Sequence, residues 1–356
     1  MTAVRTTPQT RWARVAATAV GLVAVVTVVV LAFLWPSVTA EPRDLPVAVA
    51  GEPAVVAQVR AGLEERAPGA VELVPVADRA AAVDLVESRD AYGALVLGPQ
   101  PEVLTASAAS PAVAQLLAGL QPALQAQVDA AAAAQGAPAD AVPTVAVTDV
   151  VPLSADDARG TTLAAASFPL VLGGLVGGVV VSLTVAGTWR RVTAIVVYAA
   201  LGGPAVAGLL HGLGGLHGAY VADSLAVGLA LLGIAATIVG AVRLLGRPGI
   251  AAGLVLFLLV ANPLSAAAVP VEFLLPPWGA VGQWFPPGAA ATLLRDLSYF
   301  PGADTTFPWL VLSGWAALGL LLSIVGHVRD RGAATSAALH GTEVASPVPT
   351  PAPSAR

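Results

Sequence analysis

The chain has 356 residues, of which 56% are apolar and 11% are charged, and its mean hydropathy is +0.80. A soluble domain carries about 25% charged residues, so this composition indicates a membrane protein. The sequence contains no cysteine, which excludes disulfides and thiolate-ligated metal sites, and no lysine, which excludes a Walker A motif. Any ATP-driven activity of this chain therefore requires a second protein.

The charge is unevenly distributed along the chain. Residues 37–162 hold sixteen acidic residues and six arginines, a net charge of −10, and the remaining residues carry +5. Such an asymmetry indicates segments that face different compartments. The acidic segment has two open interpretations, which are an ordinary solvated surface and a patch that binds cationic ligands.

Six uncharged segments are long and apolar enough to cross about 30 Å of hydrocarbon. They are residues 15–35, 163–187, 192–210, 224–242, 249–269 and 308–326. The absence of charged residues inside them disfavours ion- or proton-coupled transport, because such transporters keep ionisable groups within the membrane. Asp223 and Glu272 stand at the ends of predicted spans, where we expect their side chains to reach water.

Arginine placement predicts the orientation, because short cytoplasmic loops collect positive charge. The clusters precede the first span or follow the second, fourth and sixth spans, and they are Arg5, Arg11 and Arg14; Arg190 and Arg191; Arg243 and Arg247; and Arg329 and Arg331. This pattern predicts a multi-pass protein of the cell membrane with cytoplasmic N- and C-termini and with residues 37–162 extracytoplasmic. The first span is longer than a usual signal-peptide core and favours a retained anchor, with cleavage after Ala40 as the alternative.

The exported segment reads as a small α/β unit over residues 45–151. Apolar periodicity predicts strands at 45–51, 71–76, 92–99 and 144–151 and helices at 52–67, 78–89 and 111–135. Strands that alternate with helices favour a parallel βαβ sheet.

The predicted fold is therefore a polytopic α-helical membrane protein with six transmembrane helices and a small extracytoplasmic α/β domain between the first and second spans. In chain order the expected parts are a cytoplasmic N-terminus (1–14), span 1 (15–35), the exported domain (37–162), a five-span domain (163–326) and a disordered, Pro/Ala/Ser-rich cytoplasmic tail (327–356).

The segment 270–307 within the five-span domain is too polar to cross a membrane and too apolar for a free loop. Its prolines favour two short helices that dip into the outer leaflet, with its aromatic residues at the level of the headgroups: Trp278, Trp284, Phe285, Tyr299 and Phe300. Arg295 and Asp296 would then lie at the outer interface, either paired for structural reasons or in contact with substrate or lipid.

Glycines in the second span form two overlapping small-xxx-small motifs, Gly173/Gly177 and Gly174/Gly178. Such motifs let two helices approach closely. Two interpretations stay open, which are a subunit interface or pore-lining helix and internal packing of the chain.

No motif for catalysis or metal binding stands out. There is no G-x-S-x-G elbow, and Asp156 and Asp157 beside Arg159 form a loop charge cluster. His211 and His217 are six residues apart in a glycine-rich turn, a spacing that does not match a metal site. We therefore predict no catalytic, cofactor-binding or metal-binding residue, and a protein that is not an enzyme.

The layout resembles type-2 ABC exporter permeases and the related phage-infection-protein (YhgE/Pip) membrane proteins, particularly their actinobacterial members. The resemblance covers roughly residues 10–326 and rests on the order of the spans and on three stretches: AAAVDLVESRDAYGALVLGPQPEVLTASAASPAVAQLL, DVVPLSADDARGTTLAAASFPLVLGG and QWFPPGAAATLLRDLSYFPGA. It implies a permease dimer whose transport is driven by a separate ATPase. Permeases of this kind contact the ATPase through a cytoplasmic coupling helix between the second and third spans, and here that connection is only about TWRR.

Two functional hypotheses follow. The first is a permease-like subunit of an ABC-type exporter that moves a hydrophobic or envelope-related substrate, with membrane lipid, a separate ATPase and a homo- or heterodimer mate as partners, and with no nucleic acid. The second is a non-transporting envelope protein, a receptor or scaffold whose exported domain binds a partner.

Overall fold

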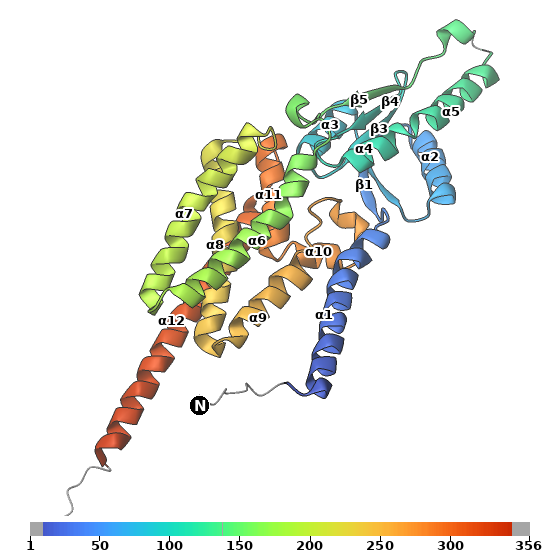
Figure 1. Ribbon diagram of the computed structural model, residues 1–356. Helices are drawn as coiled ribbons and strands as arrows, with labels where there is room; N and C mark the ends of the chain where they lie inside the picture. Colours follow the sequence, from blue (N-terminus) through green and yellow to red (C-terminus); the bar gives the residue numbers. More distant parts are fainter. Residues whose placement is uncertain (1–9, 137, 344–356) are drawn as a thin grey trace, which may run out of the picture.

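The computed structural model describes residues 10–136 and 138–343. Helices make up 67% of the structure. A sheet domain and a helical bundle lie end to end (Figure 1). We call the end of the bundle that carries the sheet domain the domain end, and the opposite end the distal end.

The sheet domain is built on five strands in the order β2-β1-β3-β4-β5. The strands are β1 (Leu45–Gly51), β2 (Val71–Val76), β3 (Gly93–Leu97), β4 (Glu102–Thr105) and β5 (Ala146–Asp149). β1 pairs in parallel with β2 and β3, whereas β4 runs antiparallel to β3 and parallel to β5. The four predicted strands are confirmed, and the short strand β4 between them was not anticipated from the sequence.

Four helices pack on this sheet: α2 (Pro53–Arg66), α3 (Arg79–Glu87), α4 (Pro111–Ala118) and α5 (Gln121–Ala134). Right-handed crossovers through α2 and α3 place these two helices on opposite faces, and β1 is buried along most of its length. Asp78 caps α3 by accepting a hydrogen bond from the Ala81 amide at 2.9 Å. The single helix predicted over 111–135 is two helices, because Pro122 in the first turn of α5 has no N–H to continue α4.

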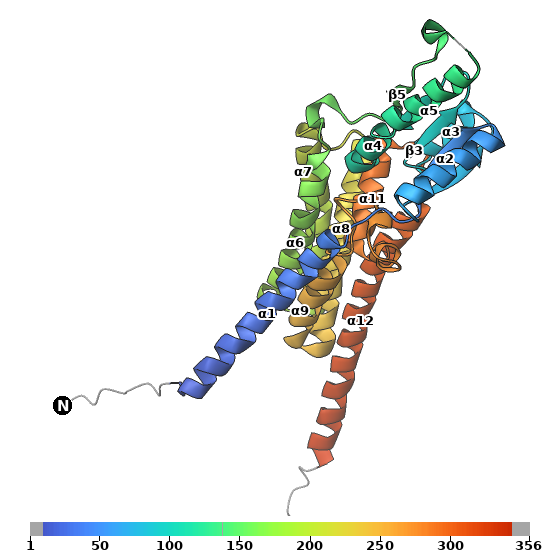
Figure 2. The same cartoon turned by 90° about the vertical axis from the view of Figure 1, so that its right-hand side faces the viewer.

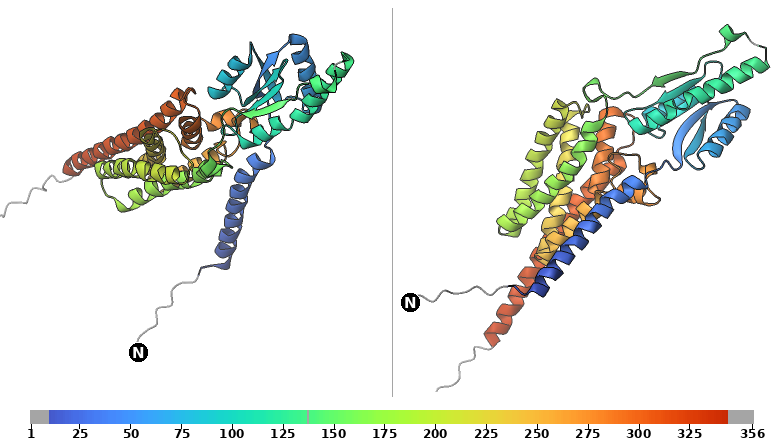
Figure 3. Two further views of the ribbon diagram at one scale, coloured as in Figure 1. Left: turned by 90° about the horizontal axis from the view of Figure 1, so that it is seen from above. Right: turned by 45° about the vertical axis from the view of Figure 1, so that its right-hand side comes forward.

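Five helices of the described chain are long and apolar enough to cross a membrane: α1 (Trp12–Val38), α6 (Thr161–Thr184), α7 (Thr188–Gly212), α8 (Tyr220–Leu245) and the first part of α12 (Thr306–Glu343). α8 is the central helix of the bundle and is packed between α6, α7 and α12. Most of α1 stands apart from these helices in Figure 1 and in the left view of Figure 3, and none of its residues is buried.

The segment predicted as a span over 249–269 forms a shorter apolar helix, Pro248–Ala261. It consists of α9 (Pro248–Leu254) followed by a π-helical turn, η3 (Val255–Ala261). At 1.5 Å per residue this helix is about 21 Å long, which is less than the hydrocarbon thickness of a bilayer. Irregular chain follows it toward the domain end.

Residues 270–307 contain the two short helices expected from the sequence, α10 (Trp278–Gly282) and α11 (Pro286–Tyr299), after a 3-10 turn, η4 (Val271–Phe273). α11 packs into the bundle against α8 and α12, and most of its residues are buried. It is therefore part of the core at the domain end.

The last helix extends beyond the bundle at its distal end, as Figure 2 shows. α12 continues to Glu343, so it takes in part of the segment that the sequence predicts as a disordered tail over 327–356. The rest of that tail, 344–356, and residues 1–9 of the predicted N-terminus lie outside the described residues.

Candidate functional site

A groove of about 550 Å³ lies at the domain end of the bundle, where α1, α6 and the chain after η3 meet. α1 and the residues after it contribute Phe33, Pro36, Ser37 and Ala40; α6 contributes Ala164, Ser167 and Phe168; and the third wall is formed by Asn262, Pro263, Ser265, Ala266, Ala267, Ala268, Val269 and Leu274. None of these side chains is ionisable. The polar groups are three serine hydroxyls and one amide, so the groove suits an apolar molecule with few polar atoms.

The last turns of α1 shape one wall. Pro36 lies inside the helix and cannot donate to the preceding turn. The hydroxyls of Ser37 and Thr39 donate to the carbonyls of Phe33 and Trp35, at 3.3 and 2.8 Å. Phe33 also makes a T-shaped contact with Phe168 on α6, with 6.1 Å between ring centroids.

Residues 262–269 form most of the third wall, and two side chains of the segment 283–295 donate hydrogen bonds to their backbone. Gln283 donates from its side-chain amide to the Ser265 carbonyl at 3.2 Å. Arg295 donates from its guanidinium to the Ala267 carbonyl at 3.1 Å. These bonds satisfy carbonyls of a segment without regular structure, and they fix its position.

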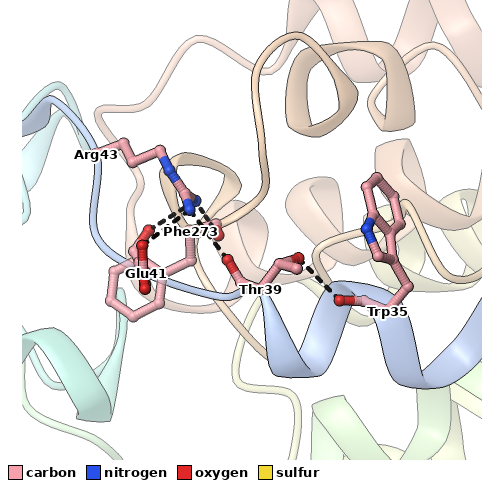
Figure 4. A network of polar contacts seen from close by, with 5 residues as sticks. All are labelled: Trp35, Thr39, Glu41, Arg43 and Phe273. Atoms are coloured by element: carbon pink, nitrogen blue, oxygen red, sulfur yellow. Dashed lines mark hydrogen bonds and ion pairs between the residues drawn. The ribbon is translucent and has the colours of Figure 1, made fainter.

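Beside the groove, Arg43 connects the end of α1 to Phe273 through a network of hydrogen bonds (Figure 4). Its guanidinium donates to the carbonyls of Thr39 and Phe273, both at 3.1 Å, and to the Glu41 carboxylate. The backbone amides of Glu41 and Arg43 also donate to the carbonyls of Phe273 and Glu272, both at 3.2 Å. The chain that leaves α1 is thereby attached to the groove wall.

A buried charged junction lies between the sheet domain and α11. Arg89, from the turn after α3, donates to the Asp296 carboxylate and lies over the Phe300 ring at 5.8 Å. The Tyr92 hydroxyl donates to Glu272 at 2.7 Å. These contacts place the sheet domain directly against the elements that support the groove.

Burial dominates the electrostatics of this junction. It raises the pKa of Asp296, and the neighbouring Arg89 opposes that shift. Burial and the like charge of Arg89 lower the pKa of Arg295 to about 10, which leaves it charged at neutral pH. Burial also raises the pKa of Tyr92, and Glu272 raises it further, so Tyr92 acts as a neutral hydrogen-bond donor.

The structure separates the roles of Arg295 and Asp296. Asp296 is 4% exposed and pairs with Arg89 of the sheet domain, whereas Arg295 holds the Ala267 carbonyl. Neither side chain lines the groove.

The expectation that Phe300 lies at headgroup level is wrong, because it is 1% exposed and belongs to the core of the sheet domain. The other aromatic residues expected there do not line the groove. Trp284 is 63% exposed and meets Phe307 at 5.0 Å, and its carbonyl accepts from the Trp315 indole at 2.8 Å. Phe285 lies against the same Trp315 ring, and Trp278 is 43% exposed.

The four glycines of α6 lie against other helices of the same chain. A Cβ at Gly174 would stand 2.7 Å from Cβ of Ile234 on α8, and a Cβ at Gly177 would stand 2.5 Å from the Tyr198 ring on α7. Gly178 faces α8, and Gly173 accepts from the Tyr198 hydroxyl through its carbonyl at 2.9 Å. In this structure the strip serves close packing of α6 on α7 and α8.

The expectation that Asp223 reaches water is wrong. Asp223 lies in the first turn of α8 and is 0% exposed, and His211, in the last turn of α7, contacts it at 2.8 Å. α8 is the central helix, so an inward-facing residue in its first turn is covered by its neighbours. Within the described residues, no group of three His, Cys, Asp or Glu side chains could hold a metal ion.

Sequence reasoning did not single out Arg43, Arg89 or Tyr92. Arg43 and Arg89 occur in segments with other charges, and Tyr92 directly precedes strand β3, so nothing in the local pattern distinguishes them. Their partners in the segment 272–296 lie 180 or more residues away in sequence.

Comparison of the chain with protein-family models, curated proteins and solved structures finds no match.

Proposed function

We propose that this chain is a permease-like membrane subunit of an ABC-type exporter that moves a hydrophobic or envelope-related molecule. The groove between α1, α6 and residues 262–274 carries the proposal. Its apolar walls and its few hydroxyl and amide groups suit the hydrocarbon part of an amphiphile, and its lack of ionisable side chains favours binding over bond-making chemistry.

The proposed topology has six membrane segments, with the distal end cytoplasmic and the sheet domain outside. The described arginines at the distal end, which are Arg190, Arg191, Arg243, Arg247 and Arg329, support this orientation. The helix Pro248–Ala261 and the irregular residues after it form the fifth segment. Irregular backbone is tolerated at this depth where it lines a cavity, as residues 262–269 do.

A separate ATPase is proposed to bind the distal end, with the permease acting as a dimer. Only residues 185–187 connect α6 to α7, which leaves little room for a coupling helix. The part of α12 beyond Arg329 reaches Glu343, about 21 Å further along the helix axis. We propose this extension as the main contact for the ATPase.

Filling the groove tests the proposal. Ser167→Trp places a large ring in the groove, and Leu172→Trp places the same ring at an exposed position of the same helix. In nanodiscs that contain a photoactivatable phospholipid, we expect the wild type and L172W to be labelled at the groove walls and S167W to lose most of that labelling. Peptide mapping by mass spectrometry locates the label.

Two outcomes contradict the groove as the binding site. One is labelling of S167W at the wild-type level, and the other is wild-type labelling spread evenly over the lipid-facing helices. Co-purification of the full chain with an ATPase tests the energy source separately, and a chain that never recruits one contradicts the exporter assignment.

One observation favours the alternative, an envelope receptor or scaffold. A second groove, of about 650 Å³, lies between α2 and strands β1 and β2 of the sheet domain, with Arg60 and Glu64 among its lining residues. β2 is an edge strand, so this surface is available to a partner. A deletion strain with unchanged efflux but an altered surface phenotype would favour this function.

A further inference from the structure

The bundle contains a buried acid–base pair that the proposed export function does not use. Asp223, in the first turn of α8, is completely buried, and its Oδ2 lies 2.8 Å from Nε2 of His211, in the last turn of α7. The His211 side chain is 25% exposed. The pair thus joins a partly exposed group to one that is sealed inside the bundle.

The surroundings leave this carboxylate only partly satisfied. Its second oxygen, Oδ1, is buried and has no hydrogen-bond partner among the described residues. Leaving a buried charge without compensation is costly, because water is no longer available to solvate it. The carboxylate therefore needs a positive charge or a proton close by.

Few other ionisable groups surround the pair. The turn 213–219 contributes His217, whose ring lies 5.4 Å from that of Tyr299 on α11. α8 contributes Tyr220, whose ring is 5.7 Å from that of His211 and whose hydroxyl donates to the Pro204 carbonyl.

Two carboxylates, Asp156 and Asp157, lie in the segment that leads from the sheet domain into α6. Asp156 packs against Gly214, and Asp157 accepts hydrogen bonds from the amides of Thr161 and Thr162 at the start of α6. Asp157 is thus occupied as a helix cap. Among the described groups, His211 is the one in direct contact with Asp223 that can supply a compensating positive charge.

We propose that His211 and Asp223 form a proton-binding site at the domain end of the bundle. The imidazole of His211 accepts one proton from solvent and becomes imidazolium, and its Nε2–H donates to Oδ2 of Asp223. No other bond is made or broken. Histidine suits this role because its ordinary titration falls between about pH 5 and pH 8.

Protonation of His211 stabilises the packing of helices at the domain end. The pair links the end of α7 to the start of α8, and the turn between them is seated on α11, where the His217 amide donates to the Ser298 hydroxyl at 3.4 Å. A Cβ at Gly218 would stand 3.2 Å from Asp223 Oδ1, so the turn closes over the carboxylate. Loss of the proton leaves a buried carboxylate beside a neutral imidazole and loosens this contact.

The small number of histidines permits a direct test. The chain has four, so the triple variant H217Q/H327Q/H340Q retains His211 alone. Nitrogen-15 histidine NMR of this full-length variant in nanodiscs reports the charge of the His211 ring as a function of pH. We expect Asp223→Asn, added to that background, to lower the proton affinity of His211 about tenfold, because an adjacent carboxylate favours the charged form. Equal proton affinities with and without Asp223 would overturn the proposal.

A second measurement does not depend on the folding of D223N. His211→Gln keeps a side-chain N–H donor for Asp223 but cannot gain a proton. We expect the thermal midpoint of the wild type to fall as the pH rises from about 6 to 8.5, across the ordinary histidine range, and the midpoint of H211Q to stay constant. His217→Gln is the matched control and retains the wild-type fall. A wild-type pH dependence in H211Q would contradict the proton-binding site. This result does not depend on whether the protein exports a substrate.

Discussion

A buried ion pair contributes to the junction between the sheet domain and the bundle. Arg89 and Asp296 are 14% and 5% exposed at their side chains, and they come from segments 207 residues apart. The guanidinium also lies over Phe300, so charge and aromatic contacts are combined at one point. Removal of either partner leaves the other charge buried without compensation.

We expect Arg89→Gln or Asp296→Asn alone to destabilise the protein by about 3 kcal/mol, because breaking a buried pair costs more than its net contribution. The double variant should be less destabilised than the sum of the two, since it buries no unpaired charge. Thermal or denaturant unfolding in detergent measures the cycle. Additive effects of the two substitutions would show that the pair is not coupled.

Close helix packing in the bundle depends on the absence of side chains at specific positions of α6. Gly174 and Gly178 lie against α8, and a Cβ at either would stand within 3 Å of an isoleucine Cβ. α8 cannot move away to make room for a side chain, because it is the most buried of the five long apolar helices. The strip therefore sets how closely α6 and α8 approach.

Gly174→Ala should destabilise the bundle by about 1–3 kcal/mol, the usual cost of overpacking a filled core. Gly314→Ala is the matched control, since Gly314 lies in another long apolar helix, α12, and has no atom within 4 Å of its added Cβ. There the gain in helix propensity should make alanine neutral or slightly stabilising. Both are measured as thermal midpoints in the same detergent. Equal effects of the two substitutions would mean that the α6–α8 contact is not tight.

The two parts of the molecule share a hydrophobic core. Phe300, which follows α11, is 1% exposed and belongs to the core of the sheet domain, and Tyr299, Ala303 and Phe273 pack against that core. The sheet domain is therefore seated on the segment that also supports the groove. A change in the position of the sheet domain would be transmitted to the groove wall through this segment.

Phe300→Ala should cost about 3–5 kcal/mol, as for other large-to-small changes at a buried aromatic residue. We expect the loss to appear mainly as faster amide hydrogen exchange in residues 45–151 and 270–303, and hydrogen-exchange mass spectrometry measures it. Phe307→Ala, at a position that is 40% exposed, is the control and should leave exchange in the sheet domain unchanged. Protection that changes only near residue 300 would contradict a shared core.

Most elements could be predicted from the sequence, because their signals are local. Strands β1, β2, β3 and β5 and the five long apolar helices follow from runs and periodicity that lie within each segment. The exceptions also have local causes. Pro122 divides one expected helix into two, and β4 is too short, at four residues, to show a period.

The site could not be predicted in the same way. The groove forms where α1, α6 and residues 262–274 meet, and the residues that hold its wall, such as Arg43 and Arg295, act through backbone carbonyls distant in sequence. The side chains that line it are common ones, most of them alanine, serine, proline and phenylalanine. No spacing of such residues distinguishes a groove from an ordinary packed surface.

By itself, the sequence determined the chemical limits of this protein: a chain rich in apolar helices, without cysteine or lysine, with its acidic residues concentrated between the first and second apolar segments. These properties depend on composition and on local pattern. Only the tertiary structure decided which charges are paired, which glycines are crowded and where a cavity remains. Those properties depend on distances between segments far apart in the chain, as when Asp223, at the end of a predicted span, proves to be buried against His211.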